Sequence, residues 1–437
     1  MKSVYPYLLG LLLLFTPFAV SCQQTWDSFI RDFQDAYEER NIARLSMVYQ
    51  DNLKAIPDLD ELGKQERFCK RSWKQLESFN RDDLSPQSQL EYDLLTYQLA
   101  LFKERLNLEK EWATHRPDSI HTGGLIHNPL GKEIYALSLK RWLDAEVHPD
   151  SLFQFGLKEV ERIKANMKKI QLDSGKDSLE FAAFLEAKSF YYQDIASTQK
   201  ALEEFAASIQ DLMPTYFPDV AATPPLKIEE GGDGRLAQVP GYYRNNTFFY
   251  NFFDTPFNKR QVGWLYMHEG VPGHHYEINH RSLVQMSPLQ YLFYSRGYSE
   301  GWAAYIEDLA LEIGAYRDIY DEYGKWEWDI IRSVRVPLDI GINYYGWSDE
   351  ECMAFWRKHI QGIDDIARRE IARMKRWPCQ VITYKYGTRK ILDWKKEWEK
   401  REDFSLLAFH TNLLARGPLP FTLLEDIMLN NAYAVQK

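Results

Sequence analysis

Four of the ten histidines lie within thirteen residues, in the segment YMHEGVPGHHYEINH that ends at His280. Its His268-Glu269 pair has the first two letters of the HExxH motif, in which two histidines one helical turn apart bind zinc and the glutamate acts as a general base. The motif is interrupted, because Pro272 occupies the position of the second histidine. The segment therefore predicts zinc chemistry with an altered spacing of the ligands.

Two histidines are candidates for the second ligand position. His274 and His275 follow His268 by six and seven residues. On an unbroken helix seven residues return to nearly the same face, which favours His275. The proline and glycine at positions 272 and 273 disfavour an unbroken helix, and a bulge there brings His274 into the place of the usual ligand. The spacing does not decide between the two.

A zinc site of this kind needs a third protein ligand and an open position for water. The segment from Arg296 to Gly314 supplies Glu300, beside glycine and alanine residues that allow close helix packing. Two turns further on, Glu307 and Asp308 are candidates to orient a ligand histidine. The alternative interpretation is that the histidines cap and pack helices and that Glu300 lies on a solvated helix face.

Helices must carry most of these side chains. Hydrophobic periodicity predicts helices over residues 24–216, one of them starting at Ser85-Pro86 and another near His148-Pro149-Asp150. A stretch rich in proline and glycine follows at 214–260, and its aromatic segment 246–253 predicts a β-strand. Helical periodicity then returns and continues to the end of the chain.

The predicted fold class is mostly α, with a small β-sheet next to the helix that carries His268. A capping box at Ser348–Glu351 opens one of the later helices. We expect residues 23–437 to form one helical domain, with an N-terminal helical part at about 23–213 and a catalytic part at about 214–437.

Composition excludes several classes of protein. With 437 residues, 45% of them hydrophobic, the chain has enough apolar material for a large core. Its net charge of -10 repels phosphate backbones, so we expect no nucleic-acid partner. Cys69, Cys352 and Cys379 are far apart and indicate neither a disulfide framework nor a cysteine zinc site, so a bound metal must use histidine and carboxylate ligands.

The first 22 residues are typical of an export signal. Lys2 precedes an apolar run, and Ala19-Val20-Ser21-Cys22 is similar to a lipobox, in which the cysteine becomes the lipidated first residue of the mature protein. We therefore expect a lipid anchor on Cys22 that holds the protein at the bacterial cell envelope, on the periplasmic face or the outer surface. Simple secretion is the alternative.

The combination of HEGVPGHHYE and SEGWAAYIEDLA resembles the bacterial domain-of-unknown-function 885 family, which is marked by HExxPGHxxQ followed by an EGWAxYxE helix. The resemblance covers most of residues 240–430. It implies that His268 and His274 bind zinc, that Glu300 is the third ligand and that Glu269 is the general base.

That family is similar to the gluzincin peptidases, which are helical enzymes with an HExxH motif and a later glutamate ligand. The resemblance therefore implies a multi-helical gluzincin-like peptidase fold, one Zn²⁺ ion and a peptide substrate. This chain departs from the family pattern at Asn343, where relatives carry histidine, and at Glu277, where they carry glutamine. The candidate substrate or oxyanion contacts are Arg335, Asn343, Tyr345 and Tyr384, and the candidates to orient the ligands are His275 and Glu307.

These observations lead to the hypothesis of an envelope-anchored zinc metallopeptidase that hydrolyses peptide bonds. One alternative is a catalytically inactive, peptidase-like lipoprotein that binds a peptide or a partner, and Asn343 is the residue that favours it. Another is a metal-dependent hydrolase of a non-peptide amide. The predicted strand near 247–253 is a candidate to pair its edge with an extended peptide, although an ordinary buried hairpin explains it equally well.

Overall fold

The computed structural model describes residues 24–433 apart from 41, 234–238, 253–255 and 431–432. The fold is mostly α with two small sheets, as the sequence predicts. The helices of the first half are α1 (Trp26–Glu39), α2 (Tyr49–Lys54), α3 (Leu59–Leu76), α4 (Pro86–Thr114), α5 (Gly131–Leu143), α6 (Pro149–Asp173), α7 (Ser178–Leu185), α8 (Ile195–Ile209) and α9 (Met213–Tyr216). The later helices are α10 (Val262–Glu269), α11 (His274–His280), α12 (Pro288–Leu292), α13 (Arg296–Glu312), α14 (Ile319–Ile340), α15 (Asp349–His359), α16 (Asp364–Arg376), α17 (Ile382–Trp398), α18 (Leu406–Leu414) and α19 (Phe421–Asn430).

The helix starts that the sequence marks are confirmed. The Ser85 hydroxyl accepts a hydrogen bond from the backbone N–H of Ser88 at 3.2 Å and caps α4. His148 caps α6, and Ser348 forms the predicted capping box of α15 with Glu351. Each cap satisfies backbone donors that the first turn of a helix leaves free.

The strands form two separate sheets. They are β1 (Tyr191–Tyr192), β2 (Lys227–Glu230), β3 (Gly241–Arg244), β4 (Thr247–Tyr250) and β5 (Phe257–Asn258). The larger sheet has the order β2-β4-β3, with β4 parallel to β2 and antiparallel to β3. The predicted strand at 246–253 is thus β4, but both of its edges are paired. Its predicted role in pairing with a peptide is therefore wrong, because no backbone edge of β4 is left free.

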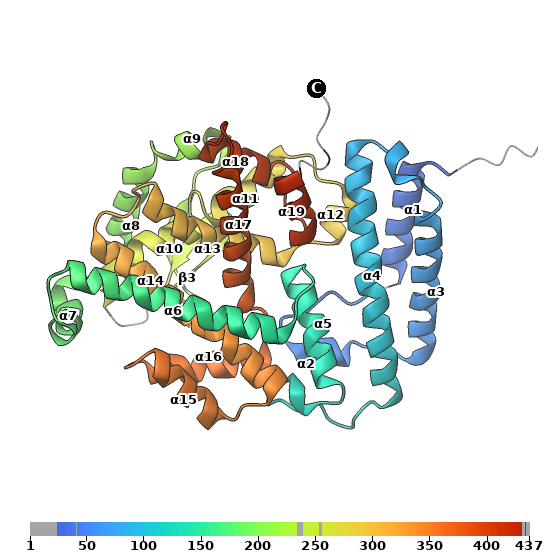
Figure 1. Cartoon of the computed structure of the whole chain (residues 1–437), viewed down its shortest axis with the longest axis horizontal. Helices are drawn as coiled ribbons and strands as arrows, with labels where there is room; N and C mark the ends of the chain where they lie inside the picture. The colour runs from blue at the N-terminus through green and yellow to red at the C-terminus, as the bar shows by residue number, and fades with distance from the viewer. Residues whose placement is uncertain (1–23, 41, 234–238, 253–255, 431–432, 434–437) are drawn as a thin grey trace, which may run out of the picture.

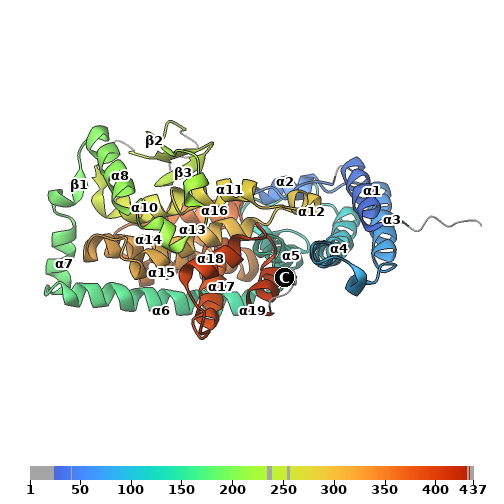
Figure 2. The same cartoon turned by 90° about the horizontal axis from the view of Figure 1, so that it is seen from above.

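The helices stand in layers around the segment that holds the histidines. Figure 2 shows the β2-β4-β3 sheet on one side of α10 and α13, and the long helix α6 running along the opposite side, against α14. Helices α1, α3 and α4 lie side by side at one end of the molecule in both views (Figures 1 and 2). Helix α10 is buried along its whole length, so the side chains at its end are fixed by packing on several sides.

Cys69, Cys352 and Cys379 are free and buried, in agreement with the absence of a predicted disulfide framework. The predicted lipidation site Cys22 lies outside the described residues. Among the helices that the structure describes, not one combines the length and apolar character that a bilayer crossing requires.

Helices α13 and α17 cross at a pair of glycines. A Cβ atom on Gly301 would lie 2.6 Å from the Cα of Gly387, and a Cβ atom on Gly387 would lie 2.5 Å from the Cα of Gly301. Real Cβ atoms essentially never approach another atom so closely, so only glycine at both positions allows this crossing. The crossing places Glu300 on α13 beside the helix that carries Tyr384.

We predict that Gly301→Val lowers the free energy of unfolding by about 2–3 kcal/mol, because overpacking a close helix contact forces the two backbones apart. Denaturant unfolding followed by far-UV circular dichroism measures this change. The matched control is Gly232→Val, since a Cβ atom at Gly232 meets nothing within 4 Å. Equal stabilities of the two variants would contradict the close crossing.

Candidate metal centre

The helix is interrupted between the first two histidines. Helix α10 ends at Glu269 and α11 begins at His274, with a tight loop over residues 270–273. A Cβ atom on Gly273 would clash with the carbonyl groups at the end of α10, so glycine allows α11 to start directly against it. The unbroken helix that would favour His275 as a ligand is absent.

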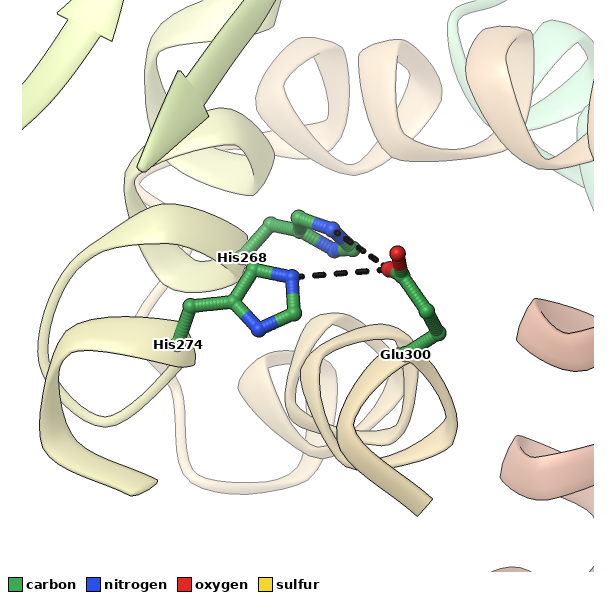
Figure 3. A group of neighbouring side chains, drawn as sticks. All are labelled: His268, His274 and Glu300. Atoms are coloured by element: carbon green, nitrogen blue, oxygen red, sulfur yellow. Dashed lines mark ion pairs between the residues drawn. The ribbon is translucent and has the colours of Figure 1, made fainter. Parts of the chain in front are cut away.

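This loop brings His274 next to His268. The centroids of the two imidazole rings lie 4.8 Å apart. The Nε2 atoms of His268 and His274 lie 3.9 and 3.5 Å from the Oε2 atom of Glu300 (Figure 3). One ligand atom from each of the three residues falls within 4.8 Å of the others, although they come from three different helices.

His275 points away from this group. Its Nε2 atom hydrogen-bonds the backbone carbonyl of Pro224 at 2.7 Å, and its Nδ1 atom lies 3.1 Å from the hydroxyl of Tyr243. The ring is fully buried. His275 therefore ties α11 to the sheet and contacts neither ligand histidine among the interactions of the described chain.

The three donors suit a divalent metal ion. Two imidazole nitrogens and one carboxylate form the ligand set of several catalytic zinc sites, which keep one further position open. The same donors also accept other first-row metals, so they establish a possible metal site without fixing the metal. The side chains of His268 and His274 are 6% and 14% exposed, whereas that of Glu300 is 28% exposed, so the group is open to solvent on the side of Glu300.

A buried carboxylate fixes the orientation of His268. The Nδ1 atom of His268 lies 2.6 Å from Oε1 of Glu307, and both oxygens of Glu307 accept hydrogen bonds of 2.6 Å from Arg332. Burial alone would raise the pKa of Glu307, but Arg332 and His268 outweigh burial and hold this pKa below its ordinary value. An ionised Glu307 holds the proton of His268 on Nδ1, which leaves Nε2 free to bind a metal. Asp308, the other candidate, pairs with Lys325 instead.

His274 has a weaker support of the same kind. The hydroxyl of Ser299 lies 3.5 Å from the Nδ1 atom of His274 and 3.2 Å from Oε2 of Glu277. Glu277 is in turn held by Arg281, whose Nε donates to Oε1 at 2.7 Å. The glutamate that replaces the family's glutamine is thus a paired, buried residue next to the metal group and not a ligand in it.

Glu269 is buried beside the ligands. Burial raises its pKa, and the like charge of Glu300 adds to this effect, whereas His268 and His274 oppose it. The pKa of Glu300 is shifted in the opposite direction. Burial would raise its pKa, but the hydrogen bond and charge of His274 lower it to about 2. In the described part of the chain no hydrogen bond reaches the Glu269 carboxylate, so it is free to exchange a proton.

Tyr384 is the predicted substrate contact that lies at the metal group. Its ring stacks on that of His268 at 6.2 Å and 27°. Gln380 donates to its hydroxyl at 3.3 Å, and the guanidinium of Arg332 lies over its ring at 5.3 Å. Burial raises its pKa, and so does the charge of Glu300, which keeps the phenol protonated.

The other three predicted contacts are engaged elsewhere. Arg335 is buried and pairs with Glu370 at 2.7 Å. Tyr345 is 40% exposed and donates to Asp150 on α6 at 2.5 Å. These two side chains support packing between helices in this structure.

Asn343 has no hydrogen-bonding group to spare. Its Nδ2 donates to the carbonyls of Asp339 and Met374, both at 3.1 Å, and its Oδ1 accepts from the backbone N–H of Leu125 at 3.0 Å. Asn343 is completely buried. The prediction that Asn343 contacts substrate is not supported, because both amide hydrogens are already used to join distant segments.

Two arginines near the metal group were not predicted from the sequence. Arg332 contacts Glu307 and lies 3.5 Å from the Nδ1 atom of His268. Arg373 donates to Gln380 at 2.7 Å. Burial would lower the pKa of Arg373, but its interactions with Tyr384, Glu370 and Glu300 raise it. Arg332 lies 25 residues from its partner Glu307, a separation for which the sequence offers no periodic signal.

Comparison with known families and structures agrees with the sequence resemblance. The profile of a family described as bacterial protein of unknown function (DUF885) matches residues 105–428. A search of curated proteins gives no match.

Two solved structures share the fold. A putative lipoprotein from Colwellia psychrerythraea superposes with a TM-score of 0.63 at 22% identity, over 91% of this chain and 72% of that chain. A putative lipoprotein of unknown function from Shewanella oneidensis superposes with a TM-score of 0.69 at 16% identity, over 93% of this chain and 100% of that chain.

We predict that the purified chain binds about one divalent metal ion, and that His268→Ala, His274→Ala and Glu300→Ala each abolish this binding, because each removes one of three ligands. Elemental analysis after reconstitution with zinc measures the metal content. His275→Ala is the matched control and should keep the ion. Loss of the ion in the His275 variant alone would show that the ligand set is wrong.

A separate prediction concerns Glu307. Glu307→Gln should weaken metal binding about 10–100-fold without abolishing it, because the neutral amide no longer fixes the proton of His268. Competition with a chromogenic chelator measures the affinity. Glu312→Gln, which changes an exposed carboxylate at the end of the same helix, should leave the metal affinity unchanged, and an equal loss in both variants would indicate a general disturbance of α13.

Proposed function

We propose that this chain, which belongs to the bacterial DUF885 family, is a zinc-dependent hydrolase of peptide bonds. One observation carries the proposal. A buried carboxylate without a hydrogen-bonding partner in the described chain, Glu269, directly follows His268, whose ring converges with His274 and Glu300 on one point. This combination of three donors and one adjacent base is what metal-assisted hydrolysis requires.

The ligand set fits zinc, with His268, His274 and Glu300 as the residues that hold it. When bound, Zn²⁺ supplies a Lewis acid that lowers the pKa of a water molecule to about 7. The resemblance to gluzincin peptidases supports a gluzincin-like arrangement of the same groups.

Glu269 is the general base. Burial raises the pKa of its carboxyl group toward neutral pH. A carboxyl group with such a pKa is better able both to accept a proton from water and to release it. The same carboxyl group then delivers the proton to the nitrogen of the departing amine.

Tyr384 is the donor for the negative charge that develops on the carbonyl oxygen of the substrate. A phenol that stays protonated can donate a hydrogen bond at neutral pH, and stacking on His268 fixes its ring. The guanidinium of Arg332 lies over the Tyr384 ring at 5.3 Å and further fixes it. This assignment replaces Asn343, whose amide is fully used in packing.

A peptide substrate is favoured by an unpaired strand edge near α10. Strand β3 pairs with β4 on one side only, within the residues that the structure describes, and it packs on α10. An extended peptide can add to such an edge through main-chain hydrogen bonds. We also propose attachment to the bacterial envelope through Cys22, which the description of both similar structures as putative lipoproteins supports.

We predict that Glu269→Gln lowers the rate of peptide hydrolysis by about 10²–10⁴-fold while the metal content stays unchanged, because the amide cannot accept the proton. Cleavage of a mixed peptide library, followed by mass spectrometry, measures the rate. Glu402→Gln, which removes an exposed carboxylate, is the control.

The pH dependence gives an independent check. Activity should fall with decreasing pH, because protonation of Glu269 removes the base. Full activity of Glu269→Gln with zinc retained would refute the role of Glu269. Zinc bound to the wild-type chain without cleavage of any peptide would refute the peptide substrate.

A further inference from the structure

A cavity lies among the N-terminal helices, in elements other than those of the metal group. It has a volume of about 460 Å³, opens to solvent and is lined by residues of α1 to α5 and the segments that join them. This size falls within the range of about 300–1,000 Å³ that is usual for small-molecule sites. Much of its wall is apolar, with Leu53, Ile56, Leu108, Trp112 and Leu137 among the lining residues.

The charged part of the wall carries an excess of cations. The lining includes four basic residues, Arg40, Lys64, Arg105 and Arg141, and three acidic residues, Glu39, Glu61 and Glu109. Lys64 is paired with Glu61 at 3.2 Å near the surface. Arg105 is buried and Arg141 is half-buried, and Glu109 is the one carboxylate that pairs with either of them in the described chain.

Arg105 is held in place by its neighbours. It donates to Gln65 at 3.0 Å, lies 3.5 Å from Glu109 and rests over the ring of Phe102 at 4.4 Å. Burial raises the pKa of Glu109, which weakens this residue as a counter-ion. One oxygen of Glu109 is buried and has no hydrogen-bond partner. Glu109 is therefore too weak a counter-ion to balance the charges of both Arg105 and Arg141.

Arg141 has no counter-ion of its own. Among the described residues, its guanidinium makes neither a hydrogen bond nor an ion pair of 4.0 Å or less. Burial lowers the pKa of Arg141 to about 10, and repulsion from Arg105 adds to this effect. Arg141 lines both the main cavity and a smaller adjoining one of about 70 Å³. Arg141 is half-buried, and a partly desolvated cation without a partner is stabilised when an anion binds beside it.

We propose that this cavity is a binding site for a small organic carboxylate with an apolar body. The carboxylate pairs with Arg141 and Arg105, because a planar guanidinium matches the geometry of a carboxylate. The apolar body lies against Trp112 and the leucine side chains of the wall. The site is independent of the proposed hydrolysis.

Isothermal titration of the purified chain with octanoate tests the proposal. We expect saturable binding of octanoate and none of octylammonium, which has the same apolar chain and the opposite charge. Acetate should bind at least about tenfold more weakly, since it lacks the apolar body. The titration is repeated with EDTA, because carboxylates also bind zinc, and the binding should persist.

Two substitutions locate the site. Arg141→Met should weaken octanoate binding about tenfold or more, through loss of a charged hydrogen bond. Arg71→Met, which removes an exposed arginine from the same group of helices, should leave the binding unchanged. Without ligand, the thermal unfolding midpoint of Arg141→Met should not fall, because the arginine has no partner to lose.

Several results would overturn the proposal. These are octanoate binding that EDTA abolishes, binding that is equal in the Arg141 variant and the wild type, equal binding of octylammonium, and no binding at all. A lower unfolding midpoint for Arg141→Met than for Arg71→Met would give Arg141 a structural role and would also overturn it.

Discussion

Two consecutive carboxylates on α13, one fully buried and one with a side chain only 9% exposed, organise the centre of this protein. A carboxylate taken out of water must be paired, and Glu307 and Asp308 both lie in the interior and find their partners on α14. Glu307 is bound by Arg332, and Asp308 by Lys325. Because Glu307 also holds His268, the pairing that α13 requires for its own burial orients the first histidine of the metal group.

The pairing of buried charges continues through the neighbouring helices. Lys325 also contacts Asp329 at 3.0 Å, Asp329 contacts Lys385 on α17 at 2.8 Å, and Lys385 contacts Glu159 on α6 at 3.0 Å. Removing one member of such a network leaves a buried charge alone, which is far more costly than the pair itself. Helices α6, α13, α14 and α17 are therefore tied together by charge as well as by packing. A site whose residues stand on such helices is held in place before substrate arrives.

The sequence predicted those parts of the site that depend on local patterns. The HE pair, the acidic helix with Glu300 and the helix caps were recognisable, because their signals lie within a few residues. The choice between His274 and His275 was not, since periodicity assumes one helix and Gly273 allows two to meet at an angle. Arg332 was missed for a different reason: its contacts with α10 and α13 are set by tertiary packing, and a buried arginine gives no regular pattern.

In the sequence, Asn343 was the residue that most favoured an inactive descendant of a peptidase. The structure no longer supports this interpretation. The amide of Asn343 joins α14 to the segments around Leu125 and Met374, which is a packing role that asparagine fills completely. Glu269 argues in the other direction. The residue is only 6% exposed and its carboxylate has no hydrogen-bond partner in the described chain, so the charge is partly desolvated at a cost in folding free energy. A protein with no use for a base at this position has a physical reason to lose it, and this chain has kept it.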